Sequence, residues 1–139
     1  MAMSANEMAI SVTTASAARW NARLLGLFGP ILILTGLGGF LVPPHLALMS
    51  GAAPYDIFHI VCGLFGTALV VARSARGIAT FNLAFGLIDL YQAAAGLLGI
   101  FPAGLFRYRP GDHVAHLLFG LLLAVVGWKG LRANRFATA

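Results

Sequence analysis

Two stretches of this chain begin apolar runs in the same way: PYDIFHIVCG at residues 54–63 and PGDHVAHLLFG at residues 110–120. Each places a proline two residues before an aspartate, a histidine about one helical turn after it, and a glycine four residues beyond that histidine. We interpret the two stretches as corresponding ends of two helices that enter a membrane from its outer side. The architecture of the whole chain follows from this repeat and from the apolar runs around it.

The composition indicates that the surroundings of the chain are a bilayer. Hydrophobic residues make up 60% of the 139 residues and charged ones 9%, whereas a soluble domain has about 45–50% apolar and roughly 25% charged residues. A chain of this size could not bury so much apolar surface in water. The net charge is +5, but the basic residues are spread over the ends of apolar segments. They form no basic face, which excludes nucleic acid as a partner.

Four apolar segments are long enough to cross about 30 Å of hydrocarbon as helices. We predict membrane spans at about residues 24–42, 56–72, 78–101 and 112–128. They lie in a transmembrane domain over residues 20–130, between a disordered or fraying tail at residues 1–19 and a basic tail at residues 131–139. The predicted fold is an all-α integral membrane four-helix bundle.

The first and third segments also repeat each other. An asparagine is followed by three glycines with nearly the same spacing: Asn21, Gly26, Gly36 and Gly39 in the first, and Asn82, Gly86, Gly96 and Gly99 in the third. Together with the repeat of the second and fourth segments, this pattern predicts a bundle made of two repeated helical hairpins.

Basic residues predict the orientation, because short loops rich in Lys and Arg stay in the cytoplasm. The nine basic residues divide seven to two between the sides of the predicted membrane: Arg19, Arg23, Arg73, Arg76, Lys129, Arg132 and Arg135 against Arg107 and Arg109. We therefore expect a multi-pass protein of the cell inner (plasma) membrane with cytoplasmic N and C termini. Aromatic belts then place Trp20 and Trp128 at the cytoplasmic interface and Tyr55 and Tyr108 at the outer one.

Three short motifs resemble those of a known family. They are Asp56-x-x-His59-x-x-x-Gly63; Asn82-x-x-x-Gly86 with Gly96 and Gly99; and Asp112-x-x-x-His116-x-x-x-Gly120. Over roughly residues 20–128 the chain resembles the small bacterial four-helix membrane proteins of the domain-of-unknown-function 4383 family. Asp56 and His113 stand where that pattern tends to have asparagine. The resemblance implies a fold and a membrane location, and it implies no activity.

Aspartates and histidines gather in the two repeated stretches. Asp56 with His59, and Asp112 with His116, are three and four residues apart, so each pair shares a helix face near the outer surface, and His113 lies one turn from His116. Carboxylates and imidazoles bind metals such as zinc, and a lone imidazole can bind a tetrapyrrole. Four ligands could converge if the second and fourth helices pack together.

A structural interpretation of the same residues competes with ligand binding. An aspartate directly before an apolar helix is a good N-cap, because its carboxylate accepts hydrogen bonds from unpaired amides and is favoured by the helix dipole. The histidine that follows can then bond to that carboxylate or to a carbonyl of the neighbouring hairpin. This interpretation needs no bound cofactor.

Asp89 is predicted to lie near the middle of the third span, roughly 14 Å deep at helical rise. A charged group there is expensive in lipid and is a candidate for function. Asp89 shares a helix stripe with Gln92, and Thr35 and Thr67 are expected at similar depth. One interpretation is a protonated Asp89 that bonds to a threonine. The others are a proton or cation pathway through Asp89 and Gln92, and contact with a polar group of a partner subunit.

Glycines on the predicted helix faces let two backbones approach closely. We expect five of them to pack helix against helix: Gly63, Gly66, Gly86, Gly96 and Gly120.

No catalytic set is apparent in the sequence, since the serines lie outside a nucleophile-elbow context and no phosphate-binding glycine loop follows a strand. The leading hypothesis is a non-enzymatic structural or accessory membrane component without a cofactor. Its expected partners are the lipid bilayer and either a larger membrane complex or further copies of itself. Two alternatives remain open. One is a metal- or tetrapyrrole-binding membrane protein that uses the outer Asp and His pairs, and the other is a proton-coupled carrier that uses Asp89.

Overall fold

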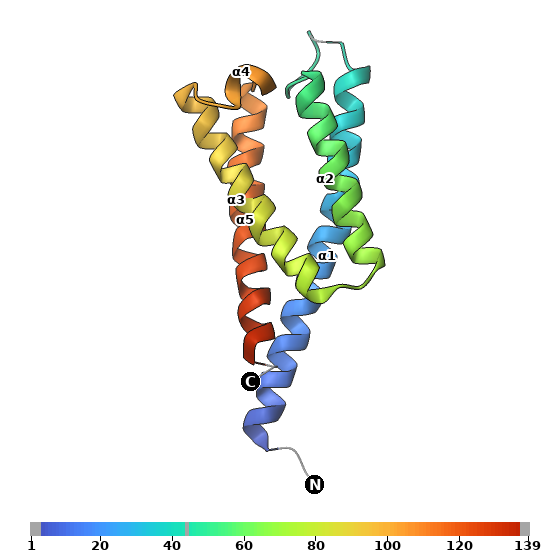
Figure 1. Cartoon of the computed structure of the whole chain (residues 1–139), viewed down its shortest axis with the longest axis vertical. Coiled ribbons are helices and arrows are strands. Elements are labelled where there is room, and N and C mark those ends of the chain that lie inside the picture. Colours follow the sequence, from blue (N-terminus) through green and yellow to red (C-terminus); the bar gives the residue numbers. More distant parts are fainter. Residues whose placement is uncertain (1–3, 44, 137–139) are drawn as a thin grey trace.

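Every regular element in the described chain is a helix. The structure, a computed structural model, describes residues 4–43 and 45–136. Its helices are α1 (Ala5–Leu41), α2 (Ala53–Val71), α3 (Ala75–Leu98), the short α4 (Ala103–Phe106) and α5 (Pro110–Phe136) (Figure 1). The predicted all-α fold is confirmed, and four of these helices, α1, α2, α3 and α5, are long and apolar enough to cross a membrane.

The four long helices form two antiparallel hairpins. Helix α1 packs along α2, and α3 packs along α5, while α1 makes most of the contact between hairpins (Figure 1). The hairpins splay apart toward the end of the bundle that holds α4, which we call the α4 end. At the opposite end, called the terminal end, α1 begins and α5 finishes (Figure 1). The first and last described residues therefore lie at the same end of the bundle.

Local sequence signals set the helix ends. Pro54 lies in the first turn of α2, where its missing N–H costs nothing. Ser74 caps α3, and its hydroxyl oxygen accepts a hydrogen bond from the backbone N–H of Gly77 at 3.2 Å. Helix α3 ends before Gly99, whose φ of +67° lies in the left-handed region that glycine adopts without strain.

Both terminal segments are more helical than predicted. Residues 5–19 belong to α1, where the sequence predicted a disordered or fraying tail, and residues 131–136 belong to α5. The first segment is rich in alanine, the best helix former, and has no glycine or proline that would stop the helix. Residues 1–3 and 137–139 of the two predicted tails, and the side chain of Arg135, lie outside the described residues.

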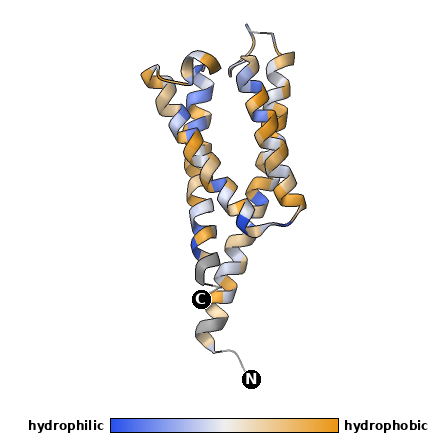
Figure 2. Ribbon diagram, in the orientation of Figure 1, coloured by the Kyte–Doolittle hydropathy of each residue, from blue (hydrophilic) through white to orange (hydrophobic). Residues whose placement is uncertain are grey.

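The helices expose apolar side chains and bury polar ones. Leu27, Leu64 and Leu121 are 66%, 56% and 57% exposed, whereas Asn82 and Asp112 are 0% exposed. Hydrophobic residues cover most of each long helix (Figure 2). A water-soluble protein has the opposite distribution. Since helices that satisfy their own backbone groups are the form in which such a chain is stable in lipid, the protein is a multi-pass membrane protein.

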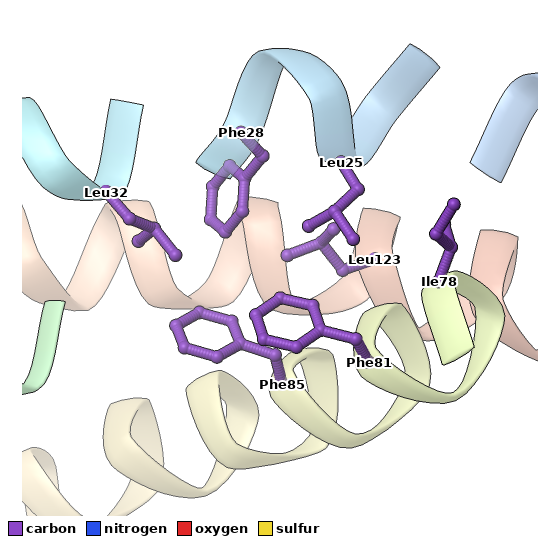
Figure 3. Packing of buried hydrophobic residues seen from close by; sticks show 7 residues of the cluster. All are labelled: Leu25, Phe28, Leu32, Ile78, Phe81, Phe85 and Leu123. Carbon is purple, nitrogen blue, oxygen red and sulfur yellow. The ribbon is translucent and has the colours of Figure 1, made fainter. Parts of the chain in front are cut away.

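The apolar core lies where α1, α3 and α5 cross. It consists of seven buried side chains: Leu25, Phe28, Leu32, Ile78, Phe81, Phe85 and Leu123 (Figure 3). The rings of Phe81 and Phe85 stack with centroids 5.4 Å apart, and Phe28 meets Phe85 edge to face at 5.8 Å. This core holds the two hairpins together at mid-height, below the splayed α4 end.

A pair of buried asparagines joins the hairpins at the terminal end. Asn82 Nδ2 donates to Asn21 Oδ1 at 2.9 Å, and Asn21 Nδ2 donates to the Val126 carbonyl oxygen at 2.9 Å. Gly130 covers this pair, because a side chain at that position would collide with Asn21. The two asparagines begin the repeated glycine series, so the repeat brings corresponding residues of α1 and α3 into direct contact.

Candidate functional site

Three hydrogen bonds converge on Asp112 at the α4 end. The Tyr55 hydroxyl donates to Oδ1 at 2.7 Å, and the backbone N–H groups of Ser50 and Arg109 donate to Oδ2 at 2.9 Å and 2.7 Å. Arg109 directly precedes α5, so Asp112 accepts a hydrogen bond from the backbone amide at the start of its own helix from within the first turn. Asp112 also holds α2 and the loop before α2 against the second hairpin.

Asp56 does not cap α2, contrary to the prediction. The cap residue is Ala52 and the helix begins at Ala53, so Asp56 lies inside the first turn. Asp56 is buried against Gly39 of α1, and neither of its carboxyl oxygens has a hydrogen-bond partner among the described residues. The N-cap prediction failed because Pro54 is accommodated within the first turn, which moves the start of the helix ahead of the aspartate.

Tyr55 is fully buried at the α4 end of the bundle. Its hydroxyl oxygen lies 3.2 Å from Nε2 of His116, and its carbonyl oxygen lies 2.8 Å from Nδ1 of His59. The two imidazole rings come from different hairpins, and they are nearly parallel, with centroids 6.4 Å apart. The sequence did not lead us to predict that Tyr55 joins the two hairpins. One difference between the repeats could have indicated it: the first has Tyr55 before its aspartate, whereas the second has Gly111.

The bonding partners decide which nitrogen of each imidazole carries the proton. A carbonyl oxygen can only accept, so Nδ1 of His59 donates to the Tyr55 carbonyl. The Tyr55 hydroxyl proton goes to Asp112, so Nε2 of His116 donates to the hydroxyl oxygen. Each neutral ring therefore keeps one unprotonated nitrogen. That of His116, Nδ1, is buried without a hydrogen-bond partner among the described residues.

A cavity of about 180 Å³ lies between the hairpins beside these rings. Its polar lining is formed by Thr35, Tyr55, His59, Asp89 and His116, and its apolar lining by Phe28, Ile31, Leu32, Met49, Ala115 and Phe119. A water molecule occupies about 30 Å³ in the liquid, so the cavity has room for a few waters or one small solute. Sites for larger ligands enclose roughly 300–1,000 Å³.

Asp89 lines this cavity from α3. Its side chain is 2% exposed, and its Oδ1 has no hydrogen-bond partner in the described part of the chain. The expected bond to a threonine is not formed through Oδ1. Thr67 instead donates to the Gly63 carbonyl of its own helix at 2.8 Å, while Thr35 lines the same cavity as Asp89. Asp89 therefore faces the space between the hairpins with one oxygen unpaired.

Gln92 takes part in a second polar contact at the α4 end. Its side-chain oxygen accepts a hydrogen bond from the Tyr108 hydroxyl at 3.0 Å. Burial raises the pKa of this hydroxyl above its ordinary value, and the nearby charge of Asp112 raises it further, so Tyr108 remains a donor. His113 packs beside Tyr108 and against Gly96, with ring centroids of His113 and Tyr108 5.9 Å apart.

The candidate metal ligands of the sequence do not converge. Among the described residues, no three His, Cys, Asp or Glu side chains come together as a group that could hold a metal ion. Convergence required α2 to pack against α5, but these helices belong to different hairpins, and their backbones do not approach each other closely within the described chain. The cavity beside His59 and His116 is also too small for a tetrapyrrole.

The five glycines predicted at helix contacts all lie against neighbouring groups. A Cβ on Gly86 would lie 2.7 Å from the Gly120 carbonyl oxygen, and a Cβ on Gly63 would lie 2.7 Å from the Gly29 carbonyl oxygen. The other two contacts are Gly66 with Leu25 and Phe81, and Gly96 with His113 and Tyr108. The two hairpins therefore pack through glycines at corresponding places, Gly29 with Gly63 and Gly86 with Gly120.

Comparison of the chain with protein-family models, with curated proteins and with solved structures finds no match in any of the three.

Proposed function

We propose that this protein is a small proton-coupled membrane carrier whose site is the cavity between the two hairpins. One observation carries the proposal: Asp89, His59 and His116, from three helices and both hairpins, line a single small cavity. A carboxyl group buried in a membrane interior costs free energy, so its presence there indicates a function. Imidazole is the side chain that most readily exchanges a proton near neutral pH.

The arrangement supports proton exchange at named atoms. Oδ1 of Asp89 and Nδ1 of His116 are both buried without a hydrogen-bond partner in the described chain, so each can take a proton without breaking an existing bond. The cavity has room for water or a small cation beside them. Because the groups come from both hairpins, a proton bound there changes the attraction between the hairpins at their splayed end, which supports a link between protonation and opening.

Reconstituted vesicles provide the test. Purified protein is placed in vesicles that contain a pH-sensitive dye, and proton movement is recorded under an imposed potassium diffusion potential. The recording is made without a solute and with methylammonium or guanidinium as small-cation probes. We expect proton movement above that of protein-free vesicles in at least one condition, and we expect Asp89→Asn to abolish it.

Asp56→Asn is the matched control. It makes the same change at a carboxyl group that is equally buried but does not line the cavity. Proton movement that survives in Asp89→Asn, or that Asp56→Asn abolishes as fully, would contradict the role of Asp89. A wild-type protein that behaves like empty vesicles with every probe would overturn the carrier proposal.

A non-catalytic accessory component of a larger membrane assembly is the second candidate. The observation that favours it is that most of the described chain is helical and exposes apolar side chains. The exposed apolar side chains of the described helices can contact other membrane helices. Purification in mild detergent from native membranes, followed by native mass measurement, should show a partner or several copies. A lone monomer would contradict this candidate.

Family membership and orientation are further proposals. We propose that the chain is related to the four-helix membrane proteins of the domain-of-unknown-function 4383 family, on the motifs around His59, Gly86 and His116. We also propose that both termini lie in the cytoplasm at the inner membrane. The position of both described ends at the terminal end of the bundle, with most of the basic residues, supports this orientation (Figure 1).

A further inference from the structure

A large groove runs between the first turns of α1 and the last turns of α5, away from the carrier site. Its volume is about 800 Å³. Two hydrogen bonds tie its walls together: the Thr14 hydroxyl donates to the Ala133 carbonyl at 3.3 Å, and Asn21 Nδ2 donates to the Val126 carbonyl at 2.9 Å. The groove exists because α1 continues as a helix beside α5.

The groove is lined by apolar, aromatic and basic side chains. They include Val12, Ala17 and Val126, the two tryptophans Trp20 and Trp128, and the basic residues Lys129 and Arg132. The guanidinium of Arg132 lies over the Trp128 ring, 5.9 Å from its centroid. None of the acidic side chains that the structure describes, Asp56, Asp89 and Asp112, lines the groove. The charged side chains that line the groove are therefore all positive among the described residues.

The position of the groove matches the headgroup layer of a bilayer. Helix α1 has 37 residues, or a length of about 56 Å, against about 30 Å of hydrocarbon. The first turns of α1 must therefore reach beyond the hydrocarbon. Tryptophan is enriched at the membrane interface, and Trp20 and Trp128 are 62% and 54% exposed at this level.

We propose that the groove binds one anionic phospholipid. Lys129 and Arg132 attract its phosphate, the two tryptophans contact its glycerol region, and its acyl chains run along the apolar side of α1 and α5 toward the core of the bilayer. Charge complementarity selects this occupant over a zwitterionic lipid, because each basic group near an anionic headgroup adds attraction. This proposal stands independently of the carrier activity.

Tryptophan fluorescence tests the proposal directly, because the chain has only two tryptophans and both line the groove. Detergent-solubilised protein is titrated with brominated phosphatidylglycerol or brominated phosphatidylcholine at low lipid content, and quenching is recorded. We expect saturable quenching at lower concentration with phosphatidylglycerol. Excess glycerol phosphate should not displace the lipid, since the acyl chains contribute to binding. Equal quenching by both lipids, or full displacement by glycerol phosphate, would overturn the proposal.

Two pairs of substitutions separate the groove from general surface charge. Lys129→Gln with Arg132→Gln should weaken phosphatidylglycerol binding by about fivefold per charge, or about 25-fold for the pair. Arg73→Gln with Arg76→Gln removes the same charge from exposed positions outside the groove and should change binding little. Equal losses in both pairs would contradict a specific site. Native mass measurement on the same samples shows whether the protein dimerises. If brominated lipid quenches neither tryptophan in the dimer, the occupant of the groove is a second copy and the lipid proposal is wrong.

Discussion

Asp56 and Asp112 occupy corresponding places in the two repeated stretches but have different surroundings. Asp112 accepts hydrogen bonds from the Tyr55 hydroxyl and from two backbone amides. Asp56 is pressed against Gly39, and its oxygens have no hydrogen-bond partner in the described chain. The difference arises because the Tyr55 side chain crosses from the first hairpin to the second and donates to Asp112. The second repeat has Gly111 at that place, and glycine has no side chain that could donate to Asp56.

Removal of the Tyr55 hydroxyl should destabilise the protein. In Tyr55→Phe, Asp112 loses the bond to Oδ1, and a hydrogen bond to a charged group contributes about 1.5–3 kcal/mol. Tyr91→Phe is the matched control, because the Tyr91 hydroxyl donates to a carbonyl oxygen at 2.6 Å at an exposed position. Its expected loss is about 0.5–1.5 kcal/mol. Unfolding in detergent, followed by circular dichroism, measures both losses. Equal losses would contradict a larger contribution of the Tyr55 hydroxyl to stability.

Tyr108 should make stability depend on alkaline pH. Burial, followed by the charge of Asp112, raises the pKa of its hydroxyl in the folded state, while an ordinary tyrosine has a pKa of about 10. The folded protein therefore holds this proton more tightly than the unfolded chain does. The resulting stabilisation is complete below about pH 10 and is lost as the pH rises from there toward the folded-state pKa.

The measurement is the free energy of unfolding of wild type and of Tyr108→Phe at several pH values. The variant should be less stable near neutral pH, because it lacks the bond to Gln92, by about 1 kcal/mol. This difference should shrink above about pH 10. A difference that stays constant or grows would show that the hydroxyl is not held in its protonated form by the folded protein.

At the scale of the elements, each hairpin is closed by glycines that allow two helix backbones to touch. Gly29 meets Gly63 between α1 and α2, and Gly86 meets Gly120 between α3 and α5. Small residues at such crossings are typical of membrane helices, where close packing replaces the hydrophobic effect as the driving force for association. These contacts lie within each hairpin, so each hairpin can form as a unit.

Gly86→Ala should weaken the second hairpin. The added methyl group would meet the backbone of α5 near Gly120 and Ala124, which cannot move without moving the helix, and overpacking of this kind costs about 1–3 kcal/mol. Gly38→Ala is the control, because Gly38 is also inside a helix and has nothing within 4 Å of the added atom. That change should be neutral or stabilise by up to about 1 kcal/mol. Thermal unfolding in detergent distinguishes the two, and a Gly86→Ala protein as stable as wild type would contradict close packing.

At the scale of the whole molecule, the hairpins are joined at both ends and in the middle. Asn21 and Asn82 join them at the terminal end, an aromatic core joins them at mid-height, and the bonds of Tyr55 join them at the α4 end. The small cavity lies between the last two of these joints. A movement that separates the hairpins at the α4 end would break the Tyr55 contacts together with the bonds of Ser50 to Asp112 and Phe106.

The orientation of the molecule can be tested with single cysteines. Cys62 is the only cysteine, so Cys62→Ala provides a background for Gly104→Cys in α4 and for Ala75→Cys beside Arg73 and Arg76. Both sites are exposed. Because the basic residues favour a cytoplasmic α2–α3 connection, a membrane-impermeant maleimide should label Gly104→Cys in intact cells. Ala75→Cys should react only after the cells are permeabilised, and the reverse pattern would contradict the proposed orientation.

The sequence by itself determined the helices and their pairing into hairpins. Long apolar runs set the number of spans, and residues such as Pro54, Ser74 and Gly99 set their ends, because these effects act within one helical turn or along one helix. The alanine-rich start of α1 was the exception. Its polar composition suggested a tail, while helix propensity and contact with α5 through Thr14 made it part of the helix.

Only the tertiary structure decided which polar groups meet. Tyr55 bonds to Asp112, 57 residues away, and Asp89 shares a cavity with His59 and His116 instead of bonding to a threonine through its unpaired oxygen. Spacing along a helix shows which face a residue occupies, but the partner depends on how the two hairpins are rotated and splayed relative to each other. That geometry is set by glycine contacts and by the core between α1, α3 and α5, which involve residues far apart in the chain.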